Sequence, residues 1–589
     1  MAGAVSLGKR LREAVRRTLI WMGRIAVAGW IAATPAQPAP AEREERPVAL
    51  PPFIVEEPTK GPPWRYAEAM GYEILSRCDD RVTRRVVEAH AALHHLLAEV
   101  LPRQFQVTMS VPRQLIVYDE ELQPAASKEV IARMLRTTPQ LPTPEDMPVP
   151  GGRGSFRLPA SAPRISFLPN LRLWDRDSMA VFMIVRRNNF DPDQLALTHD
   201  YVSFLVRQRL PSLPPWFVQG FLTLHQQMNY GGGRLTLEPL KWISELKADV
   251  AKKDSKAASL LQPLGDVLAH KLVPREPAGG HEPVKAWQAQ AALFVRWGIE
   301  PNQETRRAAF WKFVERSALA GASEALFVEC FGFDFATAQA QLTTYLAQAV
   351  RRPVNFRPAK PAKFPPLALH DASDGQIARI KGDMERLEVP YVKAISPELA
   401  PKYLEQARRT LKRGYDRGER DPRLLAVLGL CESEAGDDAA AREYLEAAVQ
   451  IGPVRPRANY ELARLRFAEF KGQPAGTDGA LSVAQTADVL RPLFAARADQ
   501  PPLPEVYELI AEAWLHSAAT PTRAHLAVLS EGVRLFPRRI ALLLRGAELH
   551  LKHGYAADAV MFLDVAARVA DDENARVRIA QLQQQLPGK

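Results

Sequence analysis

Cysteine is scarce in this chain, which has three cysteines among 589 residues. Cys78, Cys330 and Cys431 are odd in number and lie far apart without a pattern, which argues against a disulfide framework and against a cysteine zinc site. We expect all three to be buried as small apolar side chains.

Long apolar runs are also missing near the start of the chain. The run "IAVAGWIAA" (residues 25–33) is shorter than the roughly 20 residues that span a bilayer. A basic stretch precedes this run and small residues follow it up to Ala41, which is the pattern of an export signal. We therefore expect residues 1–41 to be a signal peptide, cleaved after Ala41, with an uncleaved anchor as the alternative. The mature chain is then expected in the periplasm or cell envelope, with no transmembrane span.

A basic surface of the kind that binds nucleic acid is not indicated either. The formal net charge is +10, but the first 41 residues hold six basic residues against one acidic residue, so half of the excess lies there. A nucleic-acid footprint is instead a basic face on a folded domain, and we expect no nucleic-acid partner. Apolar residues make up 47% of the chain, which excludes wholesale disorder, and the length predicts two or three domains.

Proline divides the rest of the chain. Residues 42–63 are rich in proline and charge and are expected to be a tether. A second cluster at 139–163 lies between segments with structured patterns, so we expect a long loop inside a domain. A third cluster begins at Arg352, and we expect residues 352–397 to be a semi-rigid linker between two folded regions.

Downstream of this expected linker the sequence is helical and repetitive. The stretch "PRLLAVLGLCESEAGDDAAAREYLEAAVQIGP" carries small and large apolar residues at the offsets of a tetratricopeptide (TPR) repeat, namely Leu425, Leu428, Gly429, Ala441, Leu445, Ala448 and Pro453. Glu432 departs from the pattern, which usually has an aromatic residue there. Weaker copies follow, so we expect three or four repeats over residues 398–585. Such repeats stack into an all-α superhelical solenoid, and we expect a protein or peptide partner on its concave face.

Upstream of the expected linker, helical and strand-like patterns are mixed. "RRVVEAHAALHHLLAEVLP" is an amphipathic helix, "RQLIVYD" and "MAVFMIVRR" are short apolar strands, and "DQLALTHDYVSFLVRQRL" is again helical. Strands and helices without regular alternation predict an α+β domain.

The stretch "LALTHDYVSFLVRQRLPSLPPWFVQGF" (residues 195–221) carries the most specific motif. On a helix, His199 and Ser203 lie one turn apart on the same side. The pattern resembles the peptidase MA-like branch of the gluzincins, which are thermolysin-like zincins. Their first helix carries H-E-x-x-H, and their second opens with Pro-x-Trp-Phe/Leu-x-Glu-Gly. The stretch "PPWFVQGF" matches this second pattern except that glutamine stands in place of the glutamate. The resemblance implies a zincin-like α+β domain over residues 64–351, with Trp216 and Phe217 as core anchors.

The departures from this family fall on its chemistry. By the resemblance, His199 matches the first zinc ligand, Asp200 replaces the general base, Ser203 the second histidine and Gln219 the third ligand. A hydroxyl and an amide are poor zinc ligands, because zinc favours imidazole, thiolate and carboxylate. We therefore expect a degenerate site without a catalytic residue, a cofactor or a bound metal, with His199 as the only residual ligand.

Substitute ligands are not evident near this motif. His225 lies about 240° around the helix from Gln219 and is expected to point away, as a surface or satisfied histidine. His90 and His94 have the spacing of a metal chelate but no acidic partner. A hydrolase dyad of Ser203 and His199 lacks a nucleophile turn and an oxyanion donor.

Taken together, these patterns predict a degenerate zincin-like α+β domain followed by an all-α TPR solenoid. We expect a non-catalytic, exported scaffold that combines a pseudo-metallopeptidase domain with a protein-interaction domain. The alternative is an active zinc metallopeptidase with substituted ligands, in which His199 binds the metal, Asp200 acts as base, and Gln219 or another residue coordinates.

Overall fold

The computed structural model describes most of the chain after the first 61 residues. The described residues are 62–119, 171–185, 195, 197–240, 261–270, 283–360, 362–364, 366–395, 397–570 and 572–586. They belong to one compact unit, Gly61–Lys589. The expected signal peptide, nearly all of the expected tether and the expected loop at 139–163 lie outside the described residues. Within the described part, none of the helices has the length and apolar character needed to cross a bilayer.

The upstream part of this unit is built on a six-stranded sheet with the strand order β4-β5-β3-β2-β1-β9. The strands are β1 (Arg65–Ala69), β2 (Tyr72–Ser76), β3 (Arg113–Asp119), β4 (Leu171–Trp174), β5 (Met179–Val185) and β9 (His370–Asp371). Strands β2, β3 and β5 run parallel to one another, whereas β1, β4 and β9 pair antiparallel with their neighbours. A parallel pair needs a crossover connection, and α2 (Asp80–Val100) lies in the connection between β2 and β3.

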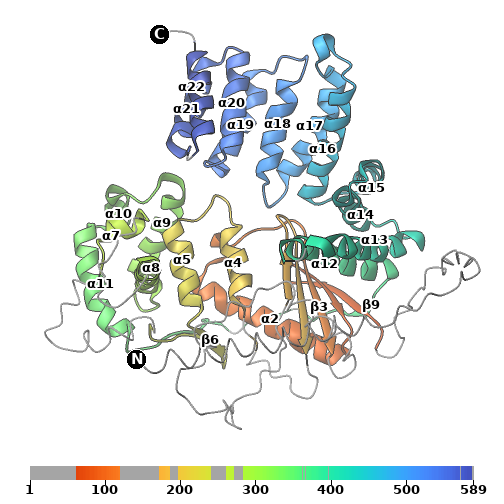
Figure 1. Cartoon of the computed structure of the whole chain (residues 1–589). Helices are drawn as coiled ribbons and strands as arrows, with labels where there is room; N and C mark the ends of the chain where they lie inside the picture. The colour runs from red at the N-terminus through yellow and green to blue at the C-terminus, as the bar shows by residue number, and fades with distance from the viewer. Residues whose placement is uncertain are drawn as a thin grey trace, which may run out of the picture. The chain divides into compact units, whose positions relative to one another are not determined.

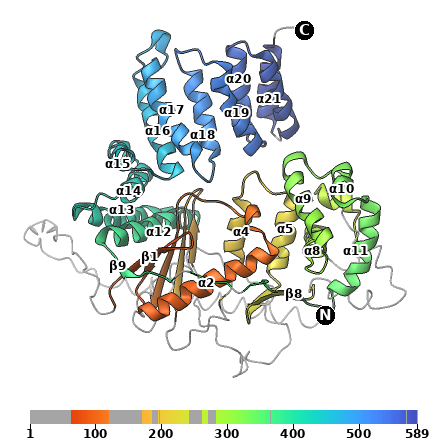
Figure 2. The ribbon, with the colours of Figure 1, turned by 180° about the vertical axis from the view of Figure 1, so that it is seen from behind.

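Both faces of the sheet are buried. Successive residues of a strand point to opposite faces, and every residue of β5 is buried. One set of side chains, which includes Val181, packs in the main core with α2. The other set, which includes Phe182, packs against Ile380 and its neighbours on α12 (Asp374–Ile395). Figures 1 and 2 show α2 and α12 lying against the sheet.

The motif helices and a helical layer complete the upstream part. The elements are α4 (His199–Arg207), α5 (Pro215–His225), α7 (Leu264–Leu268), α8 (Pro283–Ile299), α9 (Glu304–Ala320), α10 (Glu324–Phe331) and α11 (Phe335–Ala349), with a second sheet of β6 (Met228–Gly231), β7 (Arg234–Leu237) and β8 (Val354–Phe356). Trp216 and Phe217 are 1% and 0% exposed, so their prediction as core anchors is confirmed. A Cβ at Gly220 would lie 2.6 Å from the carbonyl oxygen of Ala291, which explains why α5 can approach α8 so closely. Strands and helices are mixed here as predicted.

The prediction of a linker over residues 352–397 is wrong. This stretch contains β8, β9 and α12, and α12 covers one face of the six-stranded sheet. Its apolar residues Ile380, Met384 and Leu387 recur at helical spacing, but the prolines around them outweighed that signal in the sequence. Pro390 lies inside α12 itself. Of the cysteines, Cys78 and Cys431 are buried as expected, whereas Cys330 is partly exposed.

The downstream part is an all-α solenoid of paired helices. Its further helices are α13 (Ala400–Asp416), α14 (Pro422–Ala435), α15 (Asp438–Ile451), α16 (Pro456–Gly472), α17 (Val483–Ala498), α18 (Pro504–Leu515), α19 (Arg523–Leu535), α20 (Ile540–Lys552), α21 (Ala556–Val569) and α22 (Glu573–Gln584). Short 3-10 turns lie at Arg103–Phe105, Pro397–Leu399 and Thr477–Gly479. In the described residues each even-numbered helix from α12 to α20 packs on the helix that follows it, and α22 ends the series. The solenoid therefore begins at α12, upstream of the predicted start.

Small residues lie where paired helices cross, as the repeat pattern predicts. A Cβ at Gly429 of α14 would lie 2.6 Å from Cγ of Leu445 on α15. A Cβ at Gly414 of α13 would lie 2.8 Å from that of Ala378 on α12. The departure at Glu432 also has a structural reason, because this buried carboxylate accepts a hydrogen bond of 2.6 Å from Arg408 of α13. An ion pair replaces the usual aromatic contact.

Buried charges join the sheet to the solenoid. The turn between β4 and β5 brings Asp175 and Asp177 against Arg386 of α12 and Arg455, which precedes α16. Arg455 lies 2.8 Å from Asp175, and Arg386 lies 2.8 Å from both Asp175 and Asp383. We call these five residues the sheet–solenoid junction; burial opposes ionisation of Asp175, yet Arg455 and Arg386 hold its pKa well below the ordinary value.

A second connection lies farther along the solenoid. Ser110, just before β3, donates its backbone N–H to the carbonyl oxygen of Gln500 at 2.8 Å. Gln500, between α17 and α18, donates its own N–H to Oγ of Ser110 at 2.6 Å. The loop before β3 is thus hydrogen-bonded to the middle of the solenoid.

Candidate functional site

The motif residues lie on α4 and α5, and an unanticipated arginine connects two of them. His199, Ser203 and Arg207 recur every four residues and so share one side of α4. Nε of Arg207 donates to Oγ of Ser203 at 3.0 Å, and Nη2 of Arg207 lies 3.5 Å from Oε1 of Gln219 on α5. The structure therefore brings Ser203 and Gln219 together through a guanidinium, while Asp200 is exposed. Arg207 is outside the predicted site residues, although its spacing of four residues from Ser203 is visible in the sequence.

His199 lies in a half-buried position at the first turn of α4. Its Nδ1 atom is buried and has no hydrogen-bond partner among the residues that the structure describes. Burial lowers the pKa of His199; Asp200 raises this pKa, and the positive charge of Arg207 lowers it further. The environment of His199 therefore favours the neutral imidazole.

The residues of this site do not fit a zinc ion. Zinc favours imidazole, thiolate and carboxylate ligands, and Ser203 and Gln219 offer a hydroxyl and an amide that already face a guanidinium. In the described parts of the chain, no group of three or more histidine, cysteine or acidic side chains is arranged to hold a metal ion. Ser203 and Gln219 are therefore better suited to hydrogen bonding than to coordinating zinc.

His225 of α5 lies near the first residue of the motif. Its ring centroid lies 6.5 Å from that of His199, and its side chain is buried, so of the two predicted alternatives, a surface or a satisfied histidine, the first is wrong. The angle of about 240° between Gln219 and His225 describes positions on α5 alone. Helix α4 packs on α5 and brings His199 near the last turn of α5. A helical wheel cannot include such a neighbour.

His90 and His94 meet two tyrosines and an arginine. The hydroxyl of Tyr72 lies 3.2 Å from Nε2 of His94 and 3.3 Å from Nε2 of His90. The hydroxyl of Tyr201 contacts that of Tyr72, lies 2.9 Å from Nε2 of His94, and accepts a hydrogen bond of 2.7 Å from Arg113. We call these five residues the tyrosine–histidine cluster. Burial, His90 and Arg113 lower the pKa of His94 well below its ordinary value.

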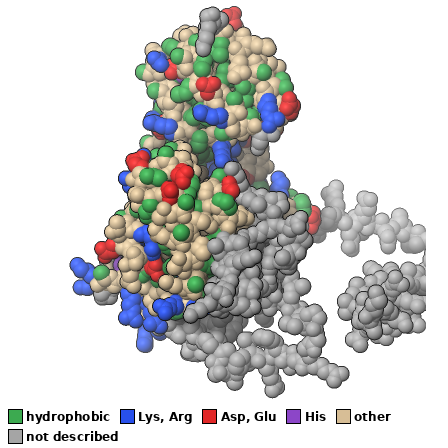
Figure 3. Space-filling model, turned by 90° about the vertical axis from the view of Figure 1, so that its left-hand side faces the viewer, with side chains coloured by type: hydrophobic (Ala, Val, Ile, Leu, Met, Phe, Trp, Pro, Cys, Tyr) green, Lys and Arg blue, Asp and Glu red, His purple; other side chains and the backbone are tan. Residues whose placement is uncertain are grey.

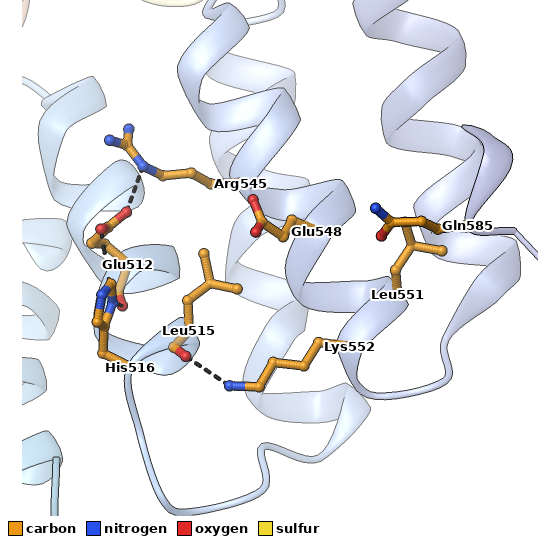
Figure 4. A pocket seen from close by; sticks show the side chains of 8 residues that line it. All are labelled: Glu512, Leu515, His516, Arg545, Glu548, Leu551, Lys552 and Gln585. Carbon is orange, nitrogen blue, oxygen red and sulfur yellow. Dashed lines mark hydrogen bonds and ion pairs between the residues drawn. The ribbon is translucent and has the colours of Figure 1, made fainter. Parts of the chain in front are cut away.

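A hollow on the solenoid is the second candidate site. It has a volume of about 600 Å³ and is formed by α18, α20 and the residue that follows α22. Figure 4 shows the side chains that line it, which are Glu512, Leu515, His516, Arg545, Glu548, Leu551, Lys552 and Gln585. Alternate helices at the end of the solenoid thus contribute to one surface.

The lining of this hollow combines apolar side chains with charges of both signs. Arg545 lies 2.7 Å from Glu512, and Nζ of Lys552 donates to the carbonyl oxygen of Leu515 at 2.7 Å. Leu515 and Leu551 supply apolar surface between these charges. Acidic and basic side chains are also interspersed over the described surface in Figure 3. The hollow therefore offers partners for polar backbone groups as well as for an apolar side chain.

The repeat spacing carries the signal that could have located this hollow. Glu512, Leu515 and His516 are followed 36 residues later by Glu548, Leu551 and Lys552, so three lining positions recur from α18 to α20. Equivalent positions of stacked repeats face the same side of a solenoid. The predicted repeats are thus the signal in the sequence that points to these lining positions.

Comparisons with known proteins place no family on the chain. No protein-family model matches it, and no curated protein matches it. Solved structures with similarity include YrrB, described as a TPR protein with an unusual peptide-binding site (12% identity, 34% of this chain, 95% of that chain, TM-score 0.25). They also include a thermophilic TPR protein of Thermus thermophilus (18%, 32%, 94%, 0.24) and the TPR2AB domain of yeast Sti1 in complex with pHSP90 (15%, 36%, 96%, 0.19). The similarity covers about a third of this chain.

Proposed function

We propose that this protein is a non-catalytic scaffold that binds a peptide segment of a partner protein in the hollow of α18, α20 and α22. The observation that carries the proposal is the recurrence of one acidic, one apolar and one basic or imidazole position from α18 to α20. An extended or helical segment presents its own side chains at regular intervals, so a repeating surface suits it. Leu515 and Leu551 would contact its apolar side chains, and the charges around them would fix its direction.

The upstream domain completes the proposal as a pseudo-metallopeptidase. The shared side of His199 and Ser203 on α4, the buried Trp216 and Phe217 of α5 and the absence of suitable zinc ligands at Ser203 and Gln219 support a degenerate zincin-like domain without a resident cofactor. We place the protein in the periplasm or cell envelope, exported by residues 1–41, on the pattern of that segment alone. The alternative is a zinc metallopeptidase with substituted ligands. It is less well supported, because the side-chain oxygens of Ser203 and Gln219 already face the guanidinium of Arg207.

Selection from a random peptide library tests the scaffold role with the full chain. We expect selected peptides to lose at least tenfold in affinity on Leu551→Asp, since a carboxylate would replace apolar surface in the hollow. Lys552→Glu changes an exposed residue of the same hollow and is the milder variant, with an expected loss of several-fold. Lys412→Glu reverses an exposed lysine on α13 and is the matched control. Failure to select a peptide, or equal affinity for all three variants, contradicts the proposal.

A further inference from the structure

We propose that the guanidinium of Arg207 stands in for the metal cation of the peptidase pattern and keeps divalent metal out of the site between α4 and α5. The inference extends the zincin-like part of the proposed function and is independent of peptide binding by the solenoid. It concerns a residue outside the positions that define the family motif, so the motif alone does not reveal it.

The geometry places one cation at two ligand positions. The second-ligand position is Ser203 and the third is Gln219, on different helices. Arg207 reaches both: its Nε atom lies 3.0 Å from Oγ of Ser203 and its Nη2 atom lies 3.5 Å from Oε1 of Gln219. A metal ion bound by these positions would have to lie among the same oxygen atoms, where the guanidinium now lies.

The first-ligand position lies on the same side of α4 as Arg207. His199, Ser203 and Arg207 follow one another at intervals of four residues along this helix. A divalent cation beside His199 would be repelled by the positive charge of Arg207 twice as strongly as a singly charged cation at the same distance.

The substituted side chains suit an arginine better than they suit zinc. A serine hydroxyl and a glutamine carbonyl are neutral hydrogen-bond acceptors, and the guanidinium offers five N–H donors in a planar fork. The neutral acceptors Ser203 and Gln219, in place of charged or imidazole ligands, therefore suit a guanidinium in place of a metal ion. Arg207 also preserves a connection between α4 and α5 that coordination of a metal by both helices would otherwise supply.

Restoring the missing ligands with and without Arg207 tests the inference. The double variant Ser203→His, Gln219→Glu retains Arg207, and the triple variant adds Arg207→Ala. Zinc content after dialysis and cobalt titration followed by visible absorption report metal binding without an activity assay. We expect the triple variant to bind at least 100-fold more tightly than the double variant.

A matched control separates a local effect from a general change of charge. The double variant combined with Arg209→Ala also loses one nearby arginine, but Arg209 donates to backbone carbonyls of Gln104 and Pro211 instead of to the motif. This control is expected to bind metal as weakly as the double variant. Equal zinc affinity of the double and triple variants overturns the inference, as does the absence of metal binding by both.

Peptide binding by the solenoid should be the same in the double and triple variants, so the two proposals can fail separately.

Discussion

The sheet–solenoid junction and the tyrosine–histidine cluster are two polar regions enclosed by the fold, but they carry charge differently. In the junction, Arg386 and Arg455 are surrounded by Asp175, Asp177 and Asp383, so positive and negative charges lie side by side. In the cluster, Arg113 is the one arginine, and it contacts the hydroxyl of Tyr201 and the ring of Tyr72. We therefore expect the unfolding free energy to fall when the junction loses one charge, and to fall when the cluster gains one.

The largest effect is expected from breaking the junction. Arg455→Met removes the cation that contacts three buried aspartates, which leaves uncompensated negative charge and costs about 3–5 kcal/mol of unfolding free energy. Chemical denaturation at pH 7 measures this loss. Arg442→Met on α15 is the control, because Arg442 is partly exposed and pairs with two carboxylates that are also open to solvent, Glu446 of the same helix and Glu469 of α16. Its expected cost is below about 1 kcal/mol. Equal losses in both variants would contradict the importance of burial.

A smaller effect is expected from removing one hydroxyl of the cluster. Tyr201→Phe deletes the acceptor of the hydrogen bond from Arg113 and the contact with His94, and should cost about 1–3 kcal/mol of unfolding free energy. Tyr444→Phe is the matched control, since Tyr444 is partly buried on α15 and packs its ring 5.1 Å from that of Tyr415. A cost for Tyr201→Phe no larger than that of Tyr444→Phe would show that these hydrogen bonds do not stabilise the cluster.

The smallest effect is expected from pH. His94 has a lowered pKa in the folded chain, so the unfolded chain binds more protons once the pH falls below about 6.5. Stability from this residue is complete above that pH and is lost as the pH falls, by up to about 1.4 kcal/mol per pH unit. His94→Gln should reduce this slope between about pH 6.5 and pH 5, as measured by denaturation at each pH. An unchanged slope would assign the pH dependence to other groups.

Local patterns in the sequence predicted the solenoid better than its connections. Gly429 and Ala441 are recognisable because the helices that cross there are neighbours in the chain. The role of α12 was missed because its apolar side chains Ile380 and Met384 contact a sheet formed hundreds of residues earlier. The prolines around α12 are typical of a linker, and they led to the wrong prediction of a linker over residues 352–397.

The candidate site was predictable in position but not in environment. The spacing of His199 and Ser203 placed both on one side of a helix, and the structure has them there. The partners of these residues depend on how α4 and α5 pack together, which brings Arg207 to Gln219 and His225 near His199. Side-chain neighbours across two helices are set by tertiary packing, for which a single sequence offers no measure.

The hydrogen bonds between Ser110 and Gln500 have a mechanical consequence. In a stack of helix pairs each pair contacts only its neighbours, so small rotations between pairs add along the stack. The solenoid is attached to the upstream part of the chain through Arg455 and again through Gln500, just before α18. We therefore expect bending to be concentrated in the helix pairs after Gln500, where it would change the width of the hollow by moving α20 and α22 relative to α18.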